Sequence, residues 1–351
     1  MTPAAETRPG LRDVAPYASP QHDVAARLNT NECPHPLPKG FFEELGESIQ
    51  GLPLHRYPDG EMTRLREDLA AHAGHPVEGT WAANGSNEIL TQLLLAYGGP
   101  GHTAIVFEPT YVLHSRLAWL THTETIRRVL EPPFRIASED VAAANGARPN
   151  VVFVCSPNNP TGNAQPVSAV RSIAAESGAL VIVDEAYIEF GGESALPLVQ
   201  DFANVAVVRT FSKAFALAGA RIGYCLATPA VVEDLQRVRL PYHMSALTQA
   251  AGITALRHKA QAGAILEDVR AQRDRIVEEL RGMPALEVFA SDANFVLFRP
   301  QRPAEGVWSA LLERGILVRD MTSVVPNALR VSAGAEHEVT LFLKALREVL
   351  G

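Results

Sequence analysis

Short apolar runs alternate with amphipathic segments through the first two thirds of the chain. Runs rich in β-branched residues predict strands over 80–83, 104–107, 123–129, 151–155, 180–184 and 205–210. Between them, apolar residues recur at helical spacing and predict helices over 63–73, 88–97, 111–120 and 167–177. Strands separated by helices are typical of an α/β layer with a mostly parallel sheet.

The pattern changes near Leu240. Residues 231–237 and 245–281 predict helices, and the second is long enough to be broken. Beyond it, strands are predicted over 286–290, 294–298, 317–319 and 329–332, and helices over 306–314 and 338–350. The first 40 residues are rich in proline and predict an extended arm. We therefore expect an arm over 1–40, a large domain over 41–240 and a small α+β domain over 241–351.

Composition narrows the class of protein. The 351 residues are 47% apolar and 20% charged, which is ordinary for a soluble globular chain. The net charge of −8 and the absence of a long basic run argue against nucleic-acid binding, and no apolar run approaches the roughly 18 residues of a membrane span. The three cysteines form no CxxC pair, and the histidines show no HxxxH or HExxH spacing. We expect a reduced, cytoplasmic protein without a metal site.

The stretch from Val207 to Gly223 carries the most distinctive chemistry. An apolar strand breaks at Thr210-Phe211-Ser212-Lys213, and a second apolar run follows. A lysine between two buried segments is costly unless it has a task. The hydroxyls of Thr210 and Ser212 and the guanidinium of Arg221 are suited to a phosphate. The pattern predicts a site for a phosphorylated carbonyl cofactor, in which Lys213 supplies the amine of a Schiff base.

Polar residues also follow two other predicted strands. Asp184 and Glu185 end the strand over 180–184, at the edge of an open α/β sheet where ligands bind. A carboxylate there can hold a pyridine nitrogen protonated, or it can cap a turn. The loop 155–162, Cys-Ser-Pro-Asn-Asn-Pro-Thr-Gly, offers adaptable amides, or it is a plain tight turn.

The turn over 84–88 lies between a strand and a helix. The free N–H groups of a helix start attract phosphate, although Ser86 or Asn87 can also be an ordinary N-cap. Tyr111, in a later turn between a strand and a helix, either stacks on a cofactor ring or packs in the core.

Two arginines lie in the short strands of the last third. Arg330 interrupts an apolar strand, and its partner is a substrate carboxylate or a structural acid. Arg319 either pairs with Asp320 or binds a second anionic group of the substrate.

Together, these motifs resemble the fold-type-I pyridoxal-phosphate aminotransferases. The resemblance covers roughly residues 11–335 and rests on NGSNE (84–88), PTY (109–111), SPNNPTG (156–162), DEAYIEF (184–190), RTFSKAFALAGARIGY (209–224), GILVRD (315–320) and LRVSAG (329–334). Within the superfamily, DEAYIEF, SKAFALAGARIGY, the opening NTNE (29–32) and RYPDG (56–60) are most similar to the histidinol-phosphate aminotransferases.

The resemblance implies an aspartate-aminotransferase-like fold. A large domain with a mostly parallel central sheet would bind pyridoxal 5′-phosphate, and the N-terminal arm would join the C-terminal third in a smaller domain. It implies a homodimer with shared active sites and two small-molecule partners, an amino donor and a 2-oxo acid acceptor. The implied reaction is L-histidinol phosphate with 2-oxoglutarate, in histidine biosynthesis.

The resemblance also implies residue roles at the cofactor. Lys213 would carry the proton between substrate and cofactor, and Asp184 would pair with the pyridinium nitrogen. Tyr187 and Asn159 would hold the ring 3-oxygen, and Tyr111 would stack on the ring. The residues that would bind the cofactor phosphate are Ser86, Asn87, Thr210, Ser212, Arg221 and, from the neighbouring subunit, Tyr57.

For the substrate, Arg330 would clamp the α-carboxylate beside Asn159. Tyr17, Asn31 and Arg319 are candidates for the substrate's own phosphate or side chain.

Two segments depart from the family pattern. The turn over 321–328 is short and lacks glycine, and Leu113-His114-Ser115 replaces the usual small and aromatic residues after Pro-Thr-Tyr. Both are expected near the substrate end. An aromatic amino-acid aminotransferase, a phosphothreonine-type decarboxylase and a non-catalytic binding protein on this fold therefore remain alternatives.

Overall fold

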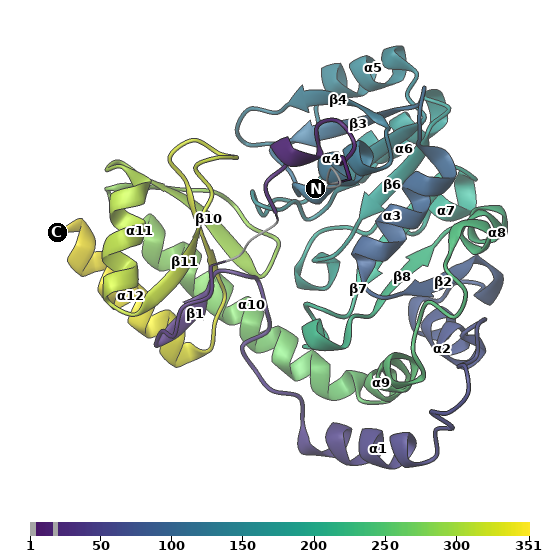
Figure 1. Ribbon diagram of the computed structural model, residues 1–351. Coiled ribbons are helices and arrows are strands. Elements are labelled where there is room, and N and C mark those ends of the chain that lie inside the picture. The colour runs from purple at the N-terminus through teal and green to yellow at the C-terminus, as the bar shows by residue number, and fades with distance from the viewer. Residues whose placement is uncertain (1–4, 17–19) are drawn as a thin grey trace.

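The computed structural model describes residues 5–16 and 20–351, which form a larger and a smaller lobe (Figure 1). In the described chain, the larger lobe holds a seven-stranded sheet in the order β2-β8-β7-β6-β5-β3-β4. Its strands are β2 (Thr80–Ala83), β3 (Thr103–Glu108), β4 (Glu124–Val129), β5 (Val151–Cys155), β6 (Leu180–Asp184), β7 (Val205–Thr210) and β8 (Gly223–Leu226). Only β8 runs opposite to the other six strands. The predicted mostly parallel sheet is confirmed.

Helices cover this sheet. Every residue of β5 and β6 is buried, which is typical of a parallel sheet packed on both faces. The helices of this lobe are α1 (Lys39–Gln50), α2 (Thr63–Ala73), α3 (Ser86–Tyr97), α4 (Leu113–Leu120), α5 (Ser138–Ala147), α6 (Val167–Glu176), α7 (Leu198–Asp201) and α8 (Pro229–Val238). Since β3, β5, β6 and β7 are parallel, the turns after them open at one edge of the sheet.

The smaller lobe is built on a second sheet in the order β1-β11-β12-β10-β9. Its elements are β1 (Ala26–Leu28), β9 (Leu286–Val288), β10 (Phe295–Pro300), β11 (Ile316–Asp320), β12 (Leu329–Ser332), α11 (Ala304–Glu313) and α12 (Glu336–Leu350). The strand β1 was not predicted, because three residues are too few to show a period. It pairs in parallel with β11, so the N-terminal arm is part of this sheet.

The strands of the second sheet present different residues to its two faces. On β10, Val296 and Phe298 pack in the core beneath α11 and α12, while Phe295 and Leu297 join the core of the larger lobe. On β12, Leu329 and Val331 also belong to the former core. The period of two therefore turns Arg330 and Ser332 towards the larger lobe.

The predicted helical segment over 245–281 is broken at His258 into α9 (Ala246–Arg257) and α10 (Lys259–Arg281). The helix α9 packs on α1 and α2, and α10 runs from there to the smaller lobe (Figure 1). Met244, Ala251 and Ala255 thus belong to the larger lobe's core, beyond the expected boundary at residue 240. None of the helices in the described ranges is long and apolar enough to cross a membrane.

Candidate active site

A cavity of about 690 Å³ lies where the strand ends of the larger lobe face β11 and β12. The predicted site residues that line it are Asn31, Ser86, Asn87, Tyr111, Asn159, Asp184, Tyr187, Thr210, Ser212, Lys213, Arg221, Arg319 and Arg330. Tyr57 lies on the surface and does not line this cavity. Tyr17 lies outside the described residues.

One end of the cavity gathers hydroxyl groups and a guanidinium. The Thr210 hydroxyl donates to Ser212 Oγ at 3.0 Å, and Arg221 Nη1 donates to the same oxygen at 3.3 Å. Beside them, Ser86 is the first residue of α3, so free N–H groups open here. Gly85 has a φ of +84°, and a Cβ on it would lie 2.6 Å from Arg221 Nη2. Only glycine lets the guanidinium lie against this helix start, and the end as a whole suits a phosphate.

Lys213 lies in the middle of the cavity. Its Nζ donates to the carbonyl oxygen of Thr30 at 3.1 Å, which joins the turn after β7 to the N-terminal arm. The pKa of Lys213 is lowered to about 8, mainly by burial and then by the Arg330 charge, while the Glu32 charge opposes the shift. A larger share of the amine is therefore neutral near pH 7 than in an exposed lysine, as a nucleophile or base requires.

Asp184 ends β6 beneath the cavity and is only 2% exposed. Its Oδ1 accepts from the Ala186 N–H, and its Oδ2 lies 3.0 Å from His114 Nε2. The other nitrogen of His114 is buried with no hydrogen-bond partner among the described residues, which places the ring proton on Nε2. His114 therefore donates to Asp184, and it is held in place by stacking on Phe153 at 4.7 Å.

A buried network connects the two lobes above Asp184. The amides of Asn31 and Asn159 donate to Tyr187 Oη at 3.1 and 3.4 Å. Arg330 donates to Asn159 Oδ1 at 2.5 Å and to the Asn29 carbonyl at 2.9 Å. Burial raises the pKa of Tyr187 to about 12, so its hydroxyl keeps its proton. This proton can be donated to a cofactor oxygen.

Tyr111 lies in the turn before α4 and not in the helix, which begins at Leu113 and not at the predicted residue 111. Its hydroxyl donates to Asn87 Oδ1 at 3.3 Å, and its ring lies edge-on to His114. The ring is thus held at the cavity wall next to the start of α3.

Sequence reasoning missed three contributors. His114 was noted only as a departure near the substrate end, whereas the structure places it against Asp184. Thr30 acts through its backbone carbonyl, which no residue type reveals. Glu32 lines the cavity, and the available signal was its place in the NTNE segment.

The residues present fit pyridoxal phosphate. The cavity offers a phosphate-binding end at Ser212 and Arg221, an amine at Lys213 and a buried carboxylate at Asp184. These groups match the cofactor's phosphate, carbonyl carbon and ring nitrogen, respectively.

Comparisons with known proteins agree with this fit. The family model described as aminotransferase class I and II matches residues 25–347. A histidinol-phosphate aminotransferase from Thermobifida fusca is 47% identical over 98% of this chain and 95% of the relative, and one from Paenarthrobacter aurescens is 46% identical over 98% and 94%. A histidinol-phosphate aminotransferase from Sinorhizobium meliloti, solved with pyridoxal-5′-phosphate, superposes with a TM-score of 0.87 at 25% identity, over 99% of this chain and 98% of that one.

Proposed function

Because the chain belongs to the class I and II aminotransferases, we propose that it transfers the amino group of L-histidinol phosphate to 2-oxoglutarate. The products are imidazole-acetol phosphate and L-glutamate. The enzyme is a pyridoxal-phosphate-dependent transaminase. The observation that carries the choice of substrate is the identity of 46–47%, over nearly the whole chain, to aminotransferases of that specificity.

Lys213 and Asp184 are the residues of this chain to which we assign proton transfer and the support of the cofactor ring. When bound, pyridoxal phosphate supplies an electron sink for the substrate's Cα and carries the nitrogen between the two substrates. Lys213 would take the proton from the substrate's Cα and return it to the C4′ carbon of the bound cofactor. Its pKa of about 8 suits a group that both accepts and releases a proton. Asp184, oriented by His114, keeps the ring nitrogen protonated.

Both substrates require an anion site. Histidinol phosphate bears a phosphate ester where an amino acid bears its α-carboxylate, and 2-oxoglutarate bears two carboxylates. We propose that Arg330, held by Asn159 and the Asn29 carbonyl, binds the phosphate of one substrate and the α-carboxylate of the other. Arg319, opposite Arg330 in the register of β11 and β12, supplies a second charge.

A comparison of amino donors tests the substrate. With saturating 2-oxoglutarate, we expect kcat/KM for histidinol phosphate to exceed that for phenylalanine by at least about 100-fold. The physical reason is that the phosphate of histidinol phosphate can form two charge-assisted pairs, whereas phenylalanine offers only a carboxylate. Each such bond is worth about 1.5–3 kcal/mol. Equal or higher values with phenylalanine would identify an aromatic amino-acid aminotransferase instead.

An exposed apolar patch supports a second proposal. Tyr57 is 80% exposed and stacks on Tyr242, with ring centroids 4.5 Å apart, and Leu54 and Leu240 are 61% and 73% exposed beside them in the same two segments. Such a patch needs a partner. We propose that a second copy covers it and that Tyr57 reaches the cofactor phosphate in that copy's cavity.

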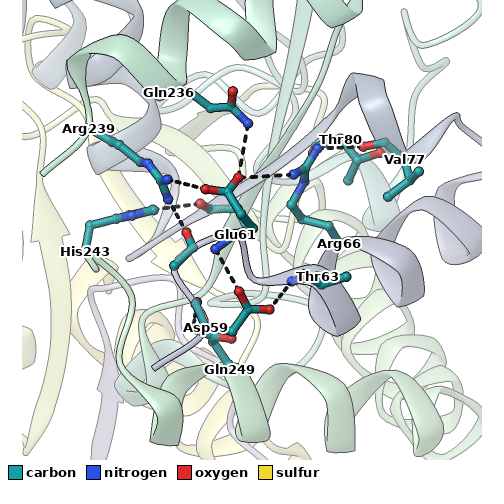
Figure 2. Close-up of polar contacts among 12 residues, drawn as sticks. Asp59, Glu61, Thr63, Arg66, Val77, Thr80, Gln236, Arg239, His243 and Gln249 are labelled. Carbon is teal, nitrogen blue, oxygen red and sulfur yellow. Dashed lines mark hydrogen bonds and ion pairs between the residues drawn. The ribbon is translucent and has the colours of Figure 1, made fainter. Parts of the chain in front are cut away.

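A polar clasp, Asp59, Glu61, Arg66 and Arg239, holds the patch in shape. Figure 2 shows Glu61 between the two arginines: Arg239 donates to it at 2.5 Å, and Arg66 lies 3.9 Å away. Asp59 accepts from the backbone N–H groups of Glu61 and Thr63 at 2.9 and 2.7 Å. The clasp thus joins the segment that carries Tyr57 to the segment that carries Tyr242, so the aromatic pair is ordered before association.

Leu240→Glu tests this surface. In sedimentation velocity at micromolar concentration, we expect a dimer for the native protein and a dimer at least about 100-fold weaker for the variant, because each copy would bury a carboxylate in place of a leucine. Leu341→Glu is the matched control, since Leu341 is 41% exposed on α12, away from the patch. A native monomer, or a variant that dimerises like the control, would refute the proposal.

We also propose the cytoplasm as the compartment. Cys33, Cys155 and Cys225 are free thiols, which suits reducing conditions.

A further inference from the structure

Glu32 places a carboxylate at the cavity wall close to Lys213. The backbone around it is fixed: Asn31 N donates to Ser332 Oγ at 2.9 Å, and the Thr30 carbonyl accepts from Lys213. The Glu32 side chain is 43% exposed, and Arg27 donates to it at 3.0 Å. A carboxylate keeps spare lone pairs after one such bond, so Glu32 can accept another hydrogen bond.

The shape of histidinol phosphate leaves one of its groups unassigned. Its Cα carries the amine, the phosphate arm and the imidazole arm. The amine must meet the cofactor near Lys213, and the phosphate is assigned to Arg330 and Arg319. The imidazole therefore points away from both of these groups, towards another part of the cavity wall. Its N–H needs an acceptor there, because a buried donor without a partner costs about 1–3 kcal/mol.

Three acidic residues line the cavity, and two of them are committed elsewhere. Asp184 is buried and accepts from His114 and from the Ala186 N–H. Asp320 lies on β11 directly after Arg319, on the side of the cavity that is assigned to the phosphate of histidinol phosphate. Glu32, in the N-terminal arm, lines the cavity, and its charge acts on Lys213.

We propose that the Glu32 carboxylate accepts a hydrogen bond from the imidazole N–H of histidinol phosphate and thereby selects this donor. This inference rests on the proposed function. Arg27 balances the charge of Glu32, so the side-chain carboxylate of 2-oxoglutarate or glutamate does not meet an uncompensated negative charge. Glu32 is accordingly a specificity residue for one of the two half-reactions.

Glu32→Gln separates the two half-reactions. We expect kcat/KM for histidinol phosphate to fall about 10- to 100-fold, mainly through KM, because the neutral amide oxygen of glutamine is a weaker acceptor than the carboxylate and its NH₂ group can oppose the imidazole N–H. The kcat/KM for glutamate as donor should stay within about twofold, and it reports folding and cofactor loading in the same sample. Glu287→Gln is the matched control, because Glu287 also pairs with an arginine, Arg299 at 2.6 Å, and does not line the cavity; it should leave the ratio of the two donors unchanged.

An analogue provides a test that does not depend on the variant's folding. On the native enzyme, the analogue with a phenyl ring in place of the imidazole should show the same 10- to 100-fold loss, and on Glu32→Gln the two donors should become nearly equal. Equal losses for histidinol phosphate and glutamate, or no loss for either, would overturn the role of Glu32. No turnover of histidinol phosphate by the native enzyme would instead overturn the proposed function itself, and the inference with it.

Discussion

Lys213→Ala is expected to lower kcat by on the order of 10⁴-fold, because positioned proton transfer alone contributes about 10²–10⁴-fold and no other amine replaces it. The Nζ of Lys213 lies against the Thr30 carbonyl inside the cavity, where burial and the Arg330 charge lower its pKa to about 8. The variant should also lose the visible absorbance of covalently attached cofactor.

Lys259→Ala is the matched control for this experiment, because Lys259 is an exposed lysine at the start of α10. It should keep both the activity and the absorbance of the native enzyme. Transamination by Lys213→Ala at the native rate would refute the assignment. A lost absorbance with retained turnover would separate cofactor attachment from proton transfer and place the latter on another residue.

Asp184→Asn is expected to have the next largest effect, a loss of about 10²–10³-fold in kcat/KM for both half-reactions. The carboxylate is 2% exposed, and an amide of the same shape cannot balance a protonated ring nitrogen in so dry a place. His114 would then donate to a neutral oxygen or lose its acceptor.

The effect of Asp184→Asn is measured by stopped flow, one substrate at a time. Asp201→Asn removes an exposed carboxylate on α7, which does not line the cavity, and should change neither half-reaction more than about threefold. An Asp184→Asn enzyme within tenfold of the native one in both half-reactions would contradict the role of this carboxylate.

Most of the larger lobe could be predicted from the sequence, because its strands are buried runs between amphipathic helices. The strand ends also predicted which residues meet: Asp184, Asn159 and Lys213 follow three parallel or adjacent strands and line one cavity. The prediction of a break in the segment 245–281 is confirmed at His258.

The rest depends on contacts between distant segments. The strand β1 forms because it pairs with the edge of β11. The paired residues, such as Ala26 and Ile316, are 290 positions apart in the sequence. The packing of α9 on α1 and α2 likewise could not be predicted from the sequence around residue 240, where the domain boundary was expected. His114 stacks on the apolar ring of Phe153 and forms a hydrogen bond with Asp184, and the sequence shows neither contact.

The roles proposed for Tyr57 and Glu32 likewise depend on groups outside their own segments. Tyr57 does not line its own chain's cavity, so its place in a site depends on a second copy. For Glu32, the decisive neighbour is the backbone carbonyl two residues before it, since that is where Lys213 donates.

The most direct test of the central claim is to follow glutamate while the cofactor-loaded native enzyme consumes histidinol phosphate in the presence of 2-oxoglutarate. We predict one glutamate for each histidinol phosphate consumed. No glutamate from histidinol phosphate, together with carbon dioxide released from threonine phosphate, would contradict it and identify a decarboxylase on the same fold.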